Sequence, residues 1–271
     1  MRVDRDLAVS RPRCIVVAGP NGAGKSSVAP FLVKELFGIG RYVNPDVIAA
    51  GLSGFDPSIV VRRAGRIALE TIDRYITDRV SFAFETTLSG RRWPQLLRTL
   101  EGAGFATTLY YLWLPSDDMA VARVQLRVAR GGHDIPEADV RRRYASSLHN
   151  LREIWLPRVD DWRLLDASRL PELEWVAAGG KGSSTIVHRA VAWFAITGQP
   201  MKEDEVRERT PDWGGHPGDG LPSLEDTLAA VNRGVRRELA IHKALGVPAA
   251  TWRDGKVVIV PPEELPSLDD E

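Results

Sequence analysis

The sequence predicts an α/β protein with a doubly wound, mainly parallel β-sheet covered by helices on both faces, plus a small C-terminal helix-hairpin unit. Three observations predict this architecture. Short apolar β-type runs alternate with longer amphipathic stretches through the first 197 residues, as is typical of a parallel sheet with crossover helices. A glycine-rich turn joins the first run to the first helical stretch. Beyond residue 198 the alternation stops, and a helix followed by a hairpin pattern closes the chain.

The expected strands are short β-type runs. These runs are Cys14–Ala18, Ser81–Phe84, Thr107–Leu114 and Arg163–Asp166. The stretches that connect them have apolar residues at helical spacing. They predict helices over Ser26–Phe37, Ile59–Asp78, Arg91–Ala103, Ser116–Arg130, Glu137–Arg158 and Ile186–Thr197. Together these elements predict one domain over residues 1–197.

A linker and a small C-terminal unit are expected after this domain. Residues 198–222 are too rich in glycine and proline for a regular element, which predicts the linker. The unit, residues 223–271, begins with Ser223 as an N-cap and Asp226 three residues later. Its apolar residues follow at helical spacing: Leu228, Val231, Val235, Leu239 and Leu245. Two strands, Ala249–Arg253 and Lys256–Val260, flank Asp254-Gly255, a strong two-residue turn signal.

The C-terminal unit is too small to bury a core of its own. We therefore expect it to dock on the first domain, on a second copy of the chain or on a partner protein. Trp252 and the apolar side of its helix would supply the contact surface. A structural brace and a regulatory lid are both open as roles, and the brace is favoured.

Composition narrows the class of function. The chain of 271 residues is 44% hydrophobic and 27% charged, as expected for a globular protein. Its 36 Lys plus Arg balance its 36 Asp plus Glu, so no overall charge attracts nucleic acid or an anionic membrane. Cys14 is the single cysteine, which excludes an internal disulfide and fits a reducing compartment. Because no signal-peptide core or membrane-length apolar stretch is found, we expect a cytoplasmic protein without membrane partners.

The glycine-rich turn matches the phosphate-binding loop of P-loop NTPases. Its residues are Gly19, Pro20, Asn21, Gly22, Ala23, Gly24, Lys25, Ser26 and Ser27. They fit the pattern G-x-x-x-x-G-K-[ST] and lie between a β-run and a helical pattern, as the mechanism requires. We expect Lys25 to reach the β- and γ-phosphates and the Ser26 hydroxyl to bind Mg²⁺. The expected nucleotide is ATP, with GTP as the alternative.

Three further segments indicate where an acceptor and a lid would lie. Asn44-Pro45-Asp46 and Phe84-Glu85-Thr86-Thr87 each end a β-type segment, where doubly wound sheets present residues to ligands. A basic segment surrounds the Gly131-Gly132 break between two helical patterns, through Arg127, Arg130, His133 and Arg143. Such an interrupted basic segment is typical of a mobile lid over phosphates.

These motifs together resemble the zeta-toxin family of P-loop kinases, which includes a form called a predicted ABC-type ATPase. The ordered set is Gly-Pro-Asn-Gly-Ala-Gly-Lys-Ser, Asn-Pro-Asp, Phe-Glu-Thr-Thr-Leu-Ser-Gly, and Gly-Gly-His-Asp-Ile-Pro followed by Arg-Arg-Arg-Tyr. The resemblance covers roughly residues 12–197. It implies an ATP-dependent phosphotransferase, because family members phosphorylate the amino sugar of UDP-N-acetylglucosamine. An antitoxin is then an expected protein partner, with self-association through the C-terminal unit as the alternative.

The resemblance also implies roles on the acceptor side. Asp46 matches an aspartate that acts as general base toward the acceptor hydroxyl, and the alternative is that Asp46 caps the helix after it. Glu85 and Thr87 match positions that hold the acceptor, and we place Asn44 in the same substrate site. Glu85 has a second possible role in the surroundings of Mg²⁺.

For the lid, the resemblance implies that Arg130 and Arg143 donate to the β- and γ-phosphates. Guanidinium groups suit this role because they bind phosphate oxygens in pairs and keep their charge. Neighbouring arginines compete for the same role, namely Arg123, Arg127, Arg141 and Arg142.

Other functions use the same parts. A nucleoside, antibiotic or polynucleotide 5′-hydroxyl kinase would need the same loop, base and lid, although the neutral net charge argues against long nucleic acids. A different class is a non-catalytic ATP-gated switch, in which nucleotide binding reshapes the lid and the C-terminal unit recruits a partner. A switch needs no base, so substitution of Asp46 distinguishes the two classes.

Overall fold

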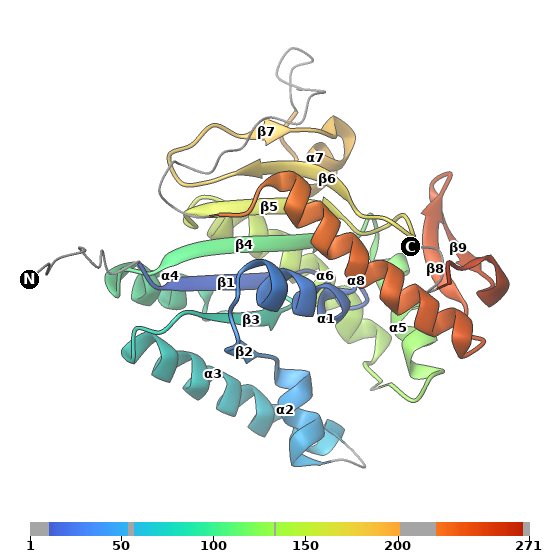
Figure 1. The fold of residues 1–271 in the computed structure, drawn as a ribbon, viewed down its shortest axis with the longest axis horizontal. Coiled ribbons are helices and arrows are strands. Elements are labelled where there is room, and N and C mark those ends of the chain that lie inside the picture. The colour runs from blue at the N-terminus through green and yellow to red at the C-terminus, as the bar shows by residue number, and fades with distance from the viewer. Residues whose placement is uncertain (1–10, 54–56, 133, 201–220, 268–271) are drawn as a thin grey trace, which may run out of the picture.

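The computed structural model describes residues 11–53, 57–132, 134–200 and 221–267, and its centre is a seven-stranded sheet (Figure 1). In spatial order the strands are β2 (Tyr42–Val43), β3 (Phe82–Thr86), β1 (Arg13–Ala18), β4 (Ala106–Trp113), β5 (Asp161–Asp166), β6 (Glu174–Gly179) and β7 (Ile186–Val187). Strands β1 to β5 pair in parallel, whereas β6 and β7 are antiparallel. The predicted doubly wound, mainly parallel sheet is confirmed.

Helices cover both faces of this sheet (Figure 1). They are α1 (Lys25–Ala29), α2 (Pro45–Leu52), α3 (Val61–Thr77), α4 (Trp93–Gly102), α5 (Asp117–Val128), α6 (Glu137–Asn150), α7 (Ala190–Thr197) and α8 (Leu224–Ala244). Two π-helical segments, Pro30–Leu36 and Leu151–Trp155, continue α1 and α6. None of the helices in the described part of the chain is both long and apolar enough to cross a membrane.

Alternate side chains of β1 enter two separate cores, as the two-residue period of a strand requires. Ile15 and Val17 belong to the core that contains α1, α5 and α8. Cys14 and Val16 belong to the core on the other face, with α3, α4 and α7. Burial raises the pKa of the Cys14 thiol well above its usual range, so this cysteine acts as a small apolar residue.

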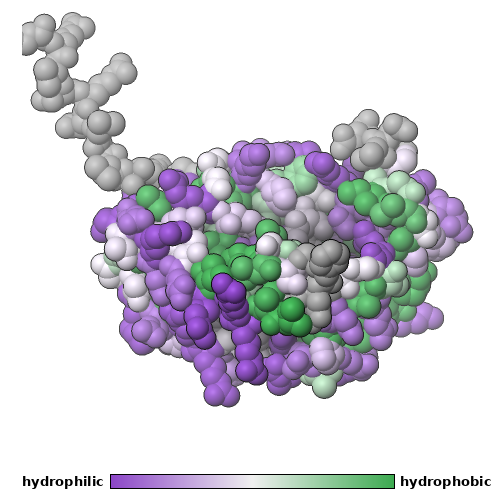
Figure 2. Space-filling model, turned by 90° about the horizontal axis from the view of Figure 1, so that it is seen from below, coloured by the Kyte–Doolittle hydropathy of each residue, from purple (hydrophilic) through white to green (hydrophobic). Residues whose placement is uncertain are grey.

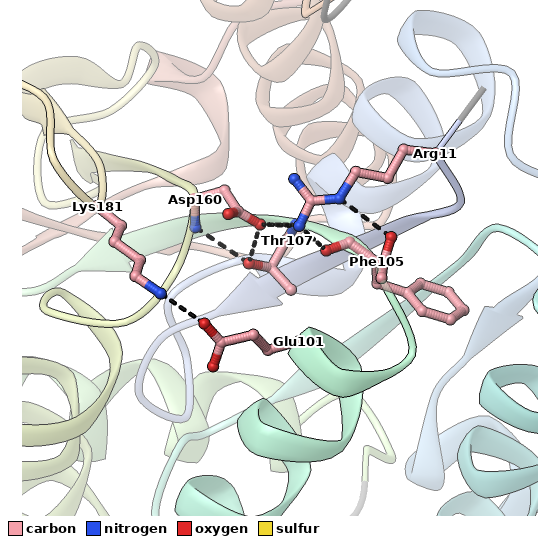
Figure 3. A network of polar contacts seen from close by, with 7 residues as sticks. Arg11, Glu101, Phe105, Thr107, Asp160 and Lys181 are labelled. Atoms are coloured by element: carbon pink, nitrogen blue, oxygen red, sulfur yellow. Dashed lines mark hydrogen bonds and ion pairs between the residues drawn. The ribbon is translucent and has the colours of Figure 1, made fainter. Parts of the chain in front are cut away.

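A polar network joins the amino ends of the central strands (Figure 3). Thr107, near the start of β4, donates its backbone N–H and its hydroxyl to Asp160, just before β5, over 2.8 and 2.9 Å. Arg11 donates to the Phe105 carbonyl over 2.6 Å and forms an ion pair with Asp160. The opposite, carboxyl edge of the sheet carries the loops that bind ligands in this fold class.

The last part of the sheet differs from the sequence prediction. Ile186–Val187, expected to begin a helix, form the edge strand β7, and the helix starts at Ala190. Branched residues suit a strand, and the His188 N–H donates to the Val176 carbonyl directly after β7. Strand β6 was not predicted, because five of its six residues are buried and it shows no polar-apolar alternation.

The C-terminal unit has the predicted elements, α8 and a hairpin of β8 (Ala249–Arg253) and β9 (Lys256–Val260). The Ser223 hydroxyl accepts from the Asp226 N–H over 2.9 Å, as predicted for the helix start. Asp254 and Gly255 have positive φ angles of 49° and 77°, as the two-residue turn requires. Leu245, expected on the apolar side of the helix, is exposed because α8 ends at Ala244.

This unit docks on the first domain of the same chain. Helix α8 lies against α1, and Gly234 is so close that a Cβ there would lie 2.6 Å from the Ser27 carbonyl oxygen. In the hairpin, the Trp252 N–H donates to the Ser168 carbonyl over 3.0 Å. Residues 201–220 of the expected linker lie outside the described residues, so the domain boundaries stay a prediction.

Candidate active site

Glycines shape the loop between β1 and α1. Gly22 and Gly24 have positive φ angles of 78° and 85°, which residues with a side chain rarely adopt. At Gly19 a Cβ would overlap the Leu112 carbonyl of the neighbouring strand β4. The loop can therefore turn tightly into the amino end of α1, where free N–H groups and the helix dipole favour phosphate.

Lys25 lies at the centre of the charged groups. It is the first residue of α1, and its buried ammonium group donates to the Pro20 carbonyl over 2.9 Å. Burial lowers the pKa of Lys25, while the carboxylates of Glu85 and Asp46 act in the opposite direction. The guanidinium groups of Arg127 and then Arg143 lower the same pKa further. Carboxylates of the predicted acceptor segments and arginines of the predicted lid therefore act on the same ammonium group.

Glu85, on β3, is a buried carboxylate that accepts from three side chains. The donors are the Ser26 hydroxyl at 2.9 Å, the Tyr42 hydroxyl at 2.6 Å and the Asn44 amide at 3.1 Å. Burial, followed by the charge of Glu85, raises the pKa of Tyr42 well above its usual range, so its phenol stays a donor. Sequence analysis missed Tyr42, although Tyr42 lies two residues before Asn44 in extended backbone, which places both side chains on one face.

The Ser26 hydroxyl and the Glu85 carboxylate fit Mg²⁺ bound together with nucleotide phosphates. Mg²⁺ prefers oxygen ligands and is commonly held by one or two protein groups plus phosphate oxygens. The described residues contain no group of three or more His, Cys, Asp or Glu that could enclose a metal ion. Of the two roles considered for Glu85, its contact with Ser26 favours the one beside the metal.

Asn44 supplies the cap of α2. Its Oδ1 accepts from the Asp46 N–H over 2.8 Å and from the Val47 N–H over 3.4 Å, so the alternative that Asp46 caps this helix is wrong. With its amide also bonded to Glu85, Asn44 positions its neighbours rather than presenting a free group to an acceptor. Asp46 is exposed and lines the cavity described below, as does Thr87.

The basic segment divides into arginines that face the site and arginines that do not. Arg123, Arg127, Arg130 and Arg143 line the cavity, and the last three, which belong to the predicted lid, are called the lid arginines below. Arg141 and Arg142 form ion pairs elsewhere, with Asp117, Asp118, Glu137 and Asp139. His133 lies outside the described residues.

Arg130 contacts the C-terminal unit, which sequence analysis did not predict. Its guanidinium pairs with the Glu238 carboxylate at 3.4 Å and contacts the His242 ring. His242 in turn contacts Glu238 at 3.4 Å. Both partners lie on α8, one helical turn apart.

These groups line one cavity of about 560 Å³. Its lining includes residues 21–27, Asp46, Glu85 and the three lid arginines. Two residues of the predicted loop, Gly19 and Pro20, are not among the residues that line the cavity. They contribute to the shape of the loop instead. The other wall comes from the segment after β5 and from the C-terminal unit.

A doubly wound sheet whose first strand leads into a P-loop, with arginines of the predicted lid lining the same cavity, defines the class of P-loop kinases. The family model described as zeta toxin matches residues 3–156. The chain therefore belongs to the zeta toxin family and is an ATP-dependent kinase. An uncharacterized protein of Haemophilus influenzae (strain ATCC 51907 / DSM 11121 / KW20 / Rd) is 31% identical over 142 residues, which cover 52% of this chain and 99% of that protein.

Solved structures share the fold over most of the chain. The crystal structure of AvrRxo1-ORF1:-ORF2 with ATP has a TM-score of 0.56 at 16% identity, covering 84% of this chain and 76% of that chain. The native AvrRxo1-ORF1:-ORF2 complex has a TM-score of 0.55 at 18% identity, with the same coverage of 84% and 76%. At these identities the likeness concerns the fold alone.

Proposed function

We propose that the protein transfers the γ-phosphate of ATP to a hydroxyl group of a nucleotide sugar, with UDP-N-acetylglucosamine as the expected substrate. The observation that carries this proposal is the placement of Asp46, whose exposed carboxylate lines the P-loop cavity and acts on Lys25. A carboxylate near the phosphates that is not needed as a helix cap is available as a general base. The choice of sugar rests on the family resemblance.

In the proposed reaction, Asp46 accepts the proton of the acceptor hydroxyl as the hydroxyl oxygen bonds to the γ-phosphorus and ADP leaves. Lys25, Arg130 and Arg143 balance the negative charge of the transferring group, which is the main contribution a protein makes to phosphoryl transfer. Thr87, on the acceptor side of the cavity, would orient the acceptor.

Ser26 and Glu85 would hold Mg²⁺, which neutralises phosphate charge when it is bound. Their contact of 2.9 Å keeps the Ser26 hydroxyl in place beside the loop. Tyr42 and Asn44 keep the carboxylate in place from the other side. The P-loop residues 19–27 would bind the phosphates themselves.

Incubation with ATP, Mg²⁺ and a panel of nucleotide sugars, nucleosides and oligonucleotides tests the proposal, with mass spectrometry to detect an added phosphoryl group. We expect a phosphorylated nucleotide sugar with the wild-type protein and far less of it with Asp46→Asn in the same time. Asp118→Asn is the matched control, because Asp118 is also an exposed aspartate in the first turn of a helix, outside the cavity. A protein that binds ATP but modifies no member of the panel would favour the switch.

We also infer that the chain acts in the cytoplasm and has an antitoxin partner, as the family resemblance implies. One suitable surface lies on α2, on the 3-10 helix Pro57–Val60 and at the start of α3, where apolar side chains remain exposed on the face shown in Figure 2. These side chains are Val47, Leu52, Ile59 and Val61. Expression of the wild-type chain alone should arrest bacterial growth, and expression of Lys25→Ala should not. Equal growth with both would remove the case for a toxin.

A further inference from the structure

We propose that the C-terminal unit is part of the nucleotide site, and that α8 and β8 form the wall against which the base of the bound nucleotide packs. This inference rests on the proposed position of ATP at the P-loop. It concerns a part of the chain that lies beyond the family match, which ends at residue 156.

The cavity has a polar end and an apolar end. Asp46, Glu85 and the lid arginines line the polar end. The apolar end is lined by Ala167, Leu170 and Leu173, which follow β5, and by Val235, Leu239 and Ala250 of the C-terminal unit. The faces of a purine are apolar, and ligand sites commonly combine apolar walls with a few polar groups.

The order of the strands places these two ends on opposite sides of the P-loop. The loop follows β1, which lies between β3 and β4. Asp46 and Glu85 come from the ends of β2 and β3, on one side, and Ala167 directly follows β5, on the other. When the γ-phosphate is directed toward Asp46, the base at the far end of the nucleotide lies toward the C-terminal unit. Figure 1 shows the β8-β9 hairpin beyond the carboxyl ends of the parallel strands, beside α5.

Arg123 joins the three segments that would surround the base. Its guanidinium donates to the Ala250 carbonyl over 3.0 Å, to the Gly22 carbonyl over 3.3 Å and to the Ser168 carbonyl over 3.4 Å. Burial lowers the pKa of Arg123 to about 10, so its guanidinium remains charged at neutral pH. The Arg123 side chain therefore hydrogen-bonds to the P-loop, to the segment after β5 and to strand β8. These hydrogen bonds hold the wall in place beside the P-loop.

Helix α8 also connects this wall to the phosphate end. Gly234 brings it against the backbone of the P-loop helix, and Glu238 and His242 contact Arg130 of the lid. Val235 and Leu239 lie on the same helix, beside these residues, and line the apolar end. One helix thus contributes to the base wall and positions an arginine at the phosphates.

Comparison of ATP with a ligand that lacks a base tests the proposal. Ala250→Leu fills the apolar end, and Ala244→Leu, at the exposed last residue of α8, is the matched control. Calorimetry would measure the Kd of ATP and of inorganic tripolyphosphate. We expect Ala250→Leu to raise the Kd of ATP by about tenfold or more, as for a misfit in an apolar pocket, without changing that of tripolyphosphate. The control should change neither.

Unchanged ATP binding in a folded Ala250→Leu variant would overturn the proposal, and so would an equal loss of both ligands. Photolabelling of the wild-type protein decides the question without any substitution. An ATP analogue with an azide on the adenine ring should label residues 221–267, and excess ATP or tripolyphosphate should prevent labelling. Absence of label from these residues would overturn the proposal.

The two proposals can fail separately. A protein that is labelled in residues 221–267 but phosphorylates no acceptor would refute the proposed function and support the base wall. A protein that phosphorylates a nucleotide sugar but carries no label in these residues would refute the base wall alone.

Discussion

A single methyl group added at Gly234 tests how closely α8 approaches the P-loop helix. A Cβ there would lie 2.6 Å from the Ser27 carbonyl oxygen and 3.0 Å from both the Val28 Cα and the Phe31 Cδ2. Favourable carbon contacts lie at about 3.5–4.0 Å. Two of the three atoms are backbone atoms of the P-loop helix and cannot rotate away. The alanine variant must therefore move α8 by several tenths of an ångström.

Two opposing effects set the change in the free energy of unfolding. Alanine is favoured over glycine in a helix interior by about 1 kcal/mol. Overpacking costs about 1–3 kcal/mol, and we take about 2–3 kcal/mol because backbone atoms form the obstruction. Gly234→Ala should thus lower stability by about 1–2 kcal/mol. Gly65→Ala, inside α3, is the control, since no described neighbour lies within 4 Å of its added Cβ. It should raise stability by about 1 kcal/mol.

Urea unfolding followed by tryptophan fluorescence gives both free energies. The Kd of ATP should also rise in Gly234→Ala, because a displaced α8 carries Val235 and Leu239 away from the cavity. An equal gain of stability in the two variants would show that the added methyl group meets no obstruction. That result would refute the close approach of α8 and weaken the case for a base wall.

Three other substitutions have defined outcomes. Lys25→Ala should keep the fold and lose phosphoryl transfer, because it removes a desolvated charge held by a loop carbonyl; circular dichroism and a transfer assay check both parts. Arg143→Ala should lower kcat much more than it changes the KM of ATP, and a pure KM effect in steady-state kinetics would make Arg143 a binding residue. Glu238→Gln should be less stable than the wild type near neutral pH, with a difference that shrinks in acid. His242, followed by Arg130, lowers the pKa of Glu238 below its ordinary value of 4.5, so its stabilisation is present above that value and is lost as pH falls through the folded pKa. A difference in urea midpoint that stays constant into acid would contradict this.

Features that depend on adjacent residues could be predicted from the sequence. Asp254-Gly255 defines its turn because both residues adopt positive φ, and Ser223 defines the start of α8 through its own hydrogen bond. The P-loop could be located because glycines are needed at set positions in its turn. In each case the physical cause lies within a few residues of the signal.

Features that join distant segments could not be predicted. Tyr42 meets Glu85 across 43 positions of sequence, and Arg130 meets Glu238 across 108. A helical pattern shows which side of α8 is apolar but not which surface it covers, so docking on the first domain of the chain was one of three open choices. Edge elements were also missed, because Ile186–Val187 is too short for either periodicity to be decisive.

The account depends most on Asp46 as the base that makes this P-loop site a kinase. The direct measurement is transfer from γ-labelled ATP to UDP-N-acetylglucosamine, with the wild-type protein and Asp46→Asn compared at saturating ATP and Mg²⁺. The account predicts label in the nucleotide sugar with the wild type, and a kcat lower by about 10²–10⁴-fold in the variant with little change in the KM of ATP. Label that appears only in inorganic phosphate, or equal transfer by the two proteins, would contradict it.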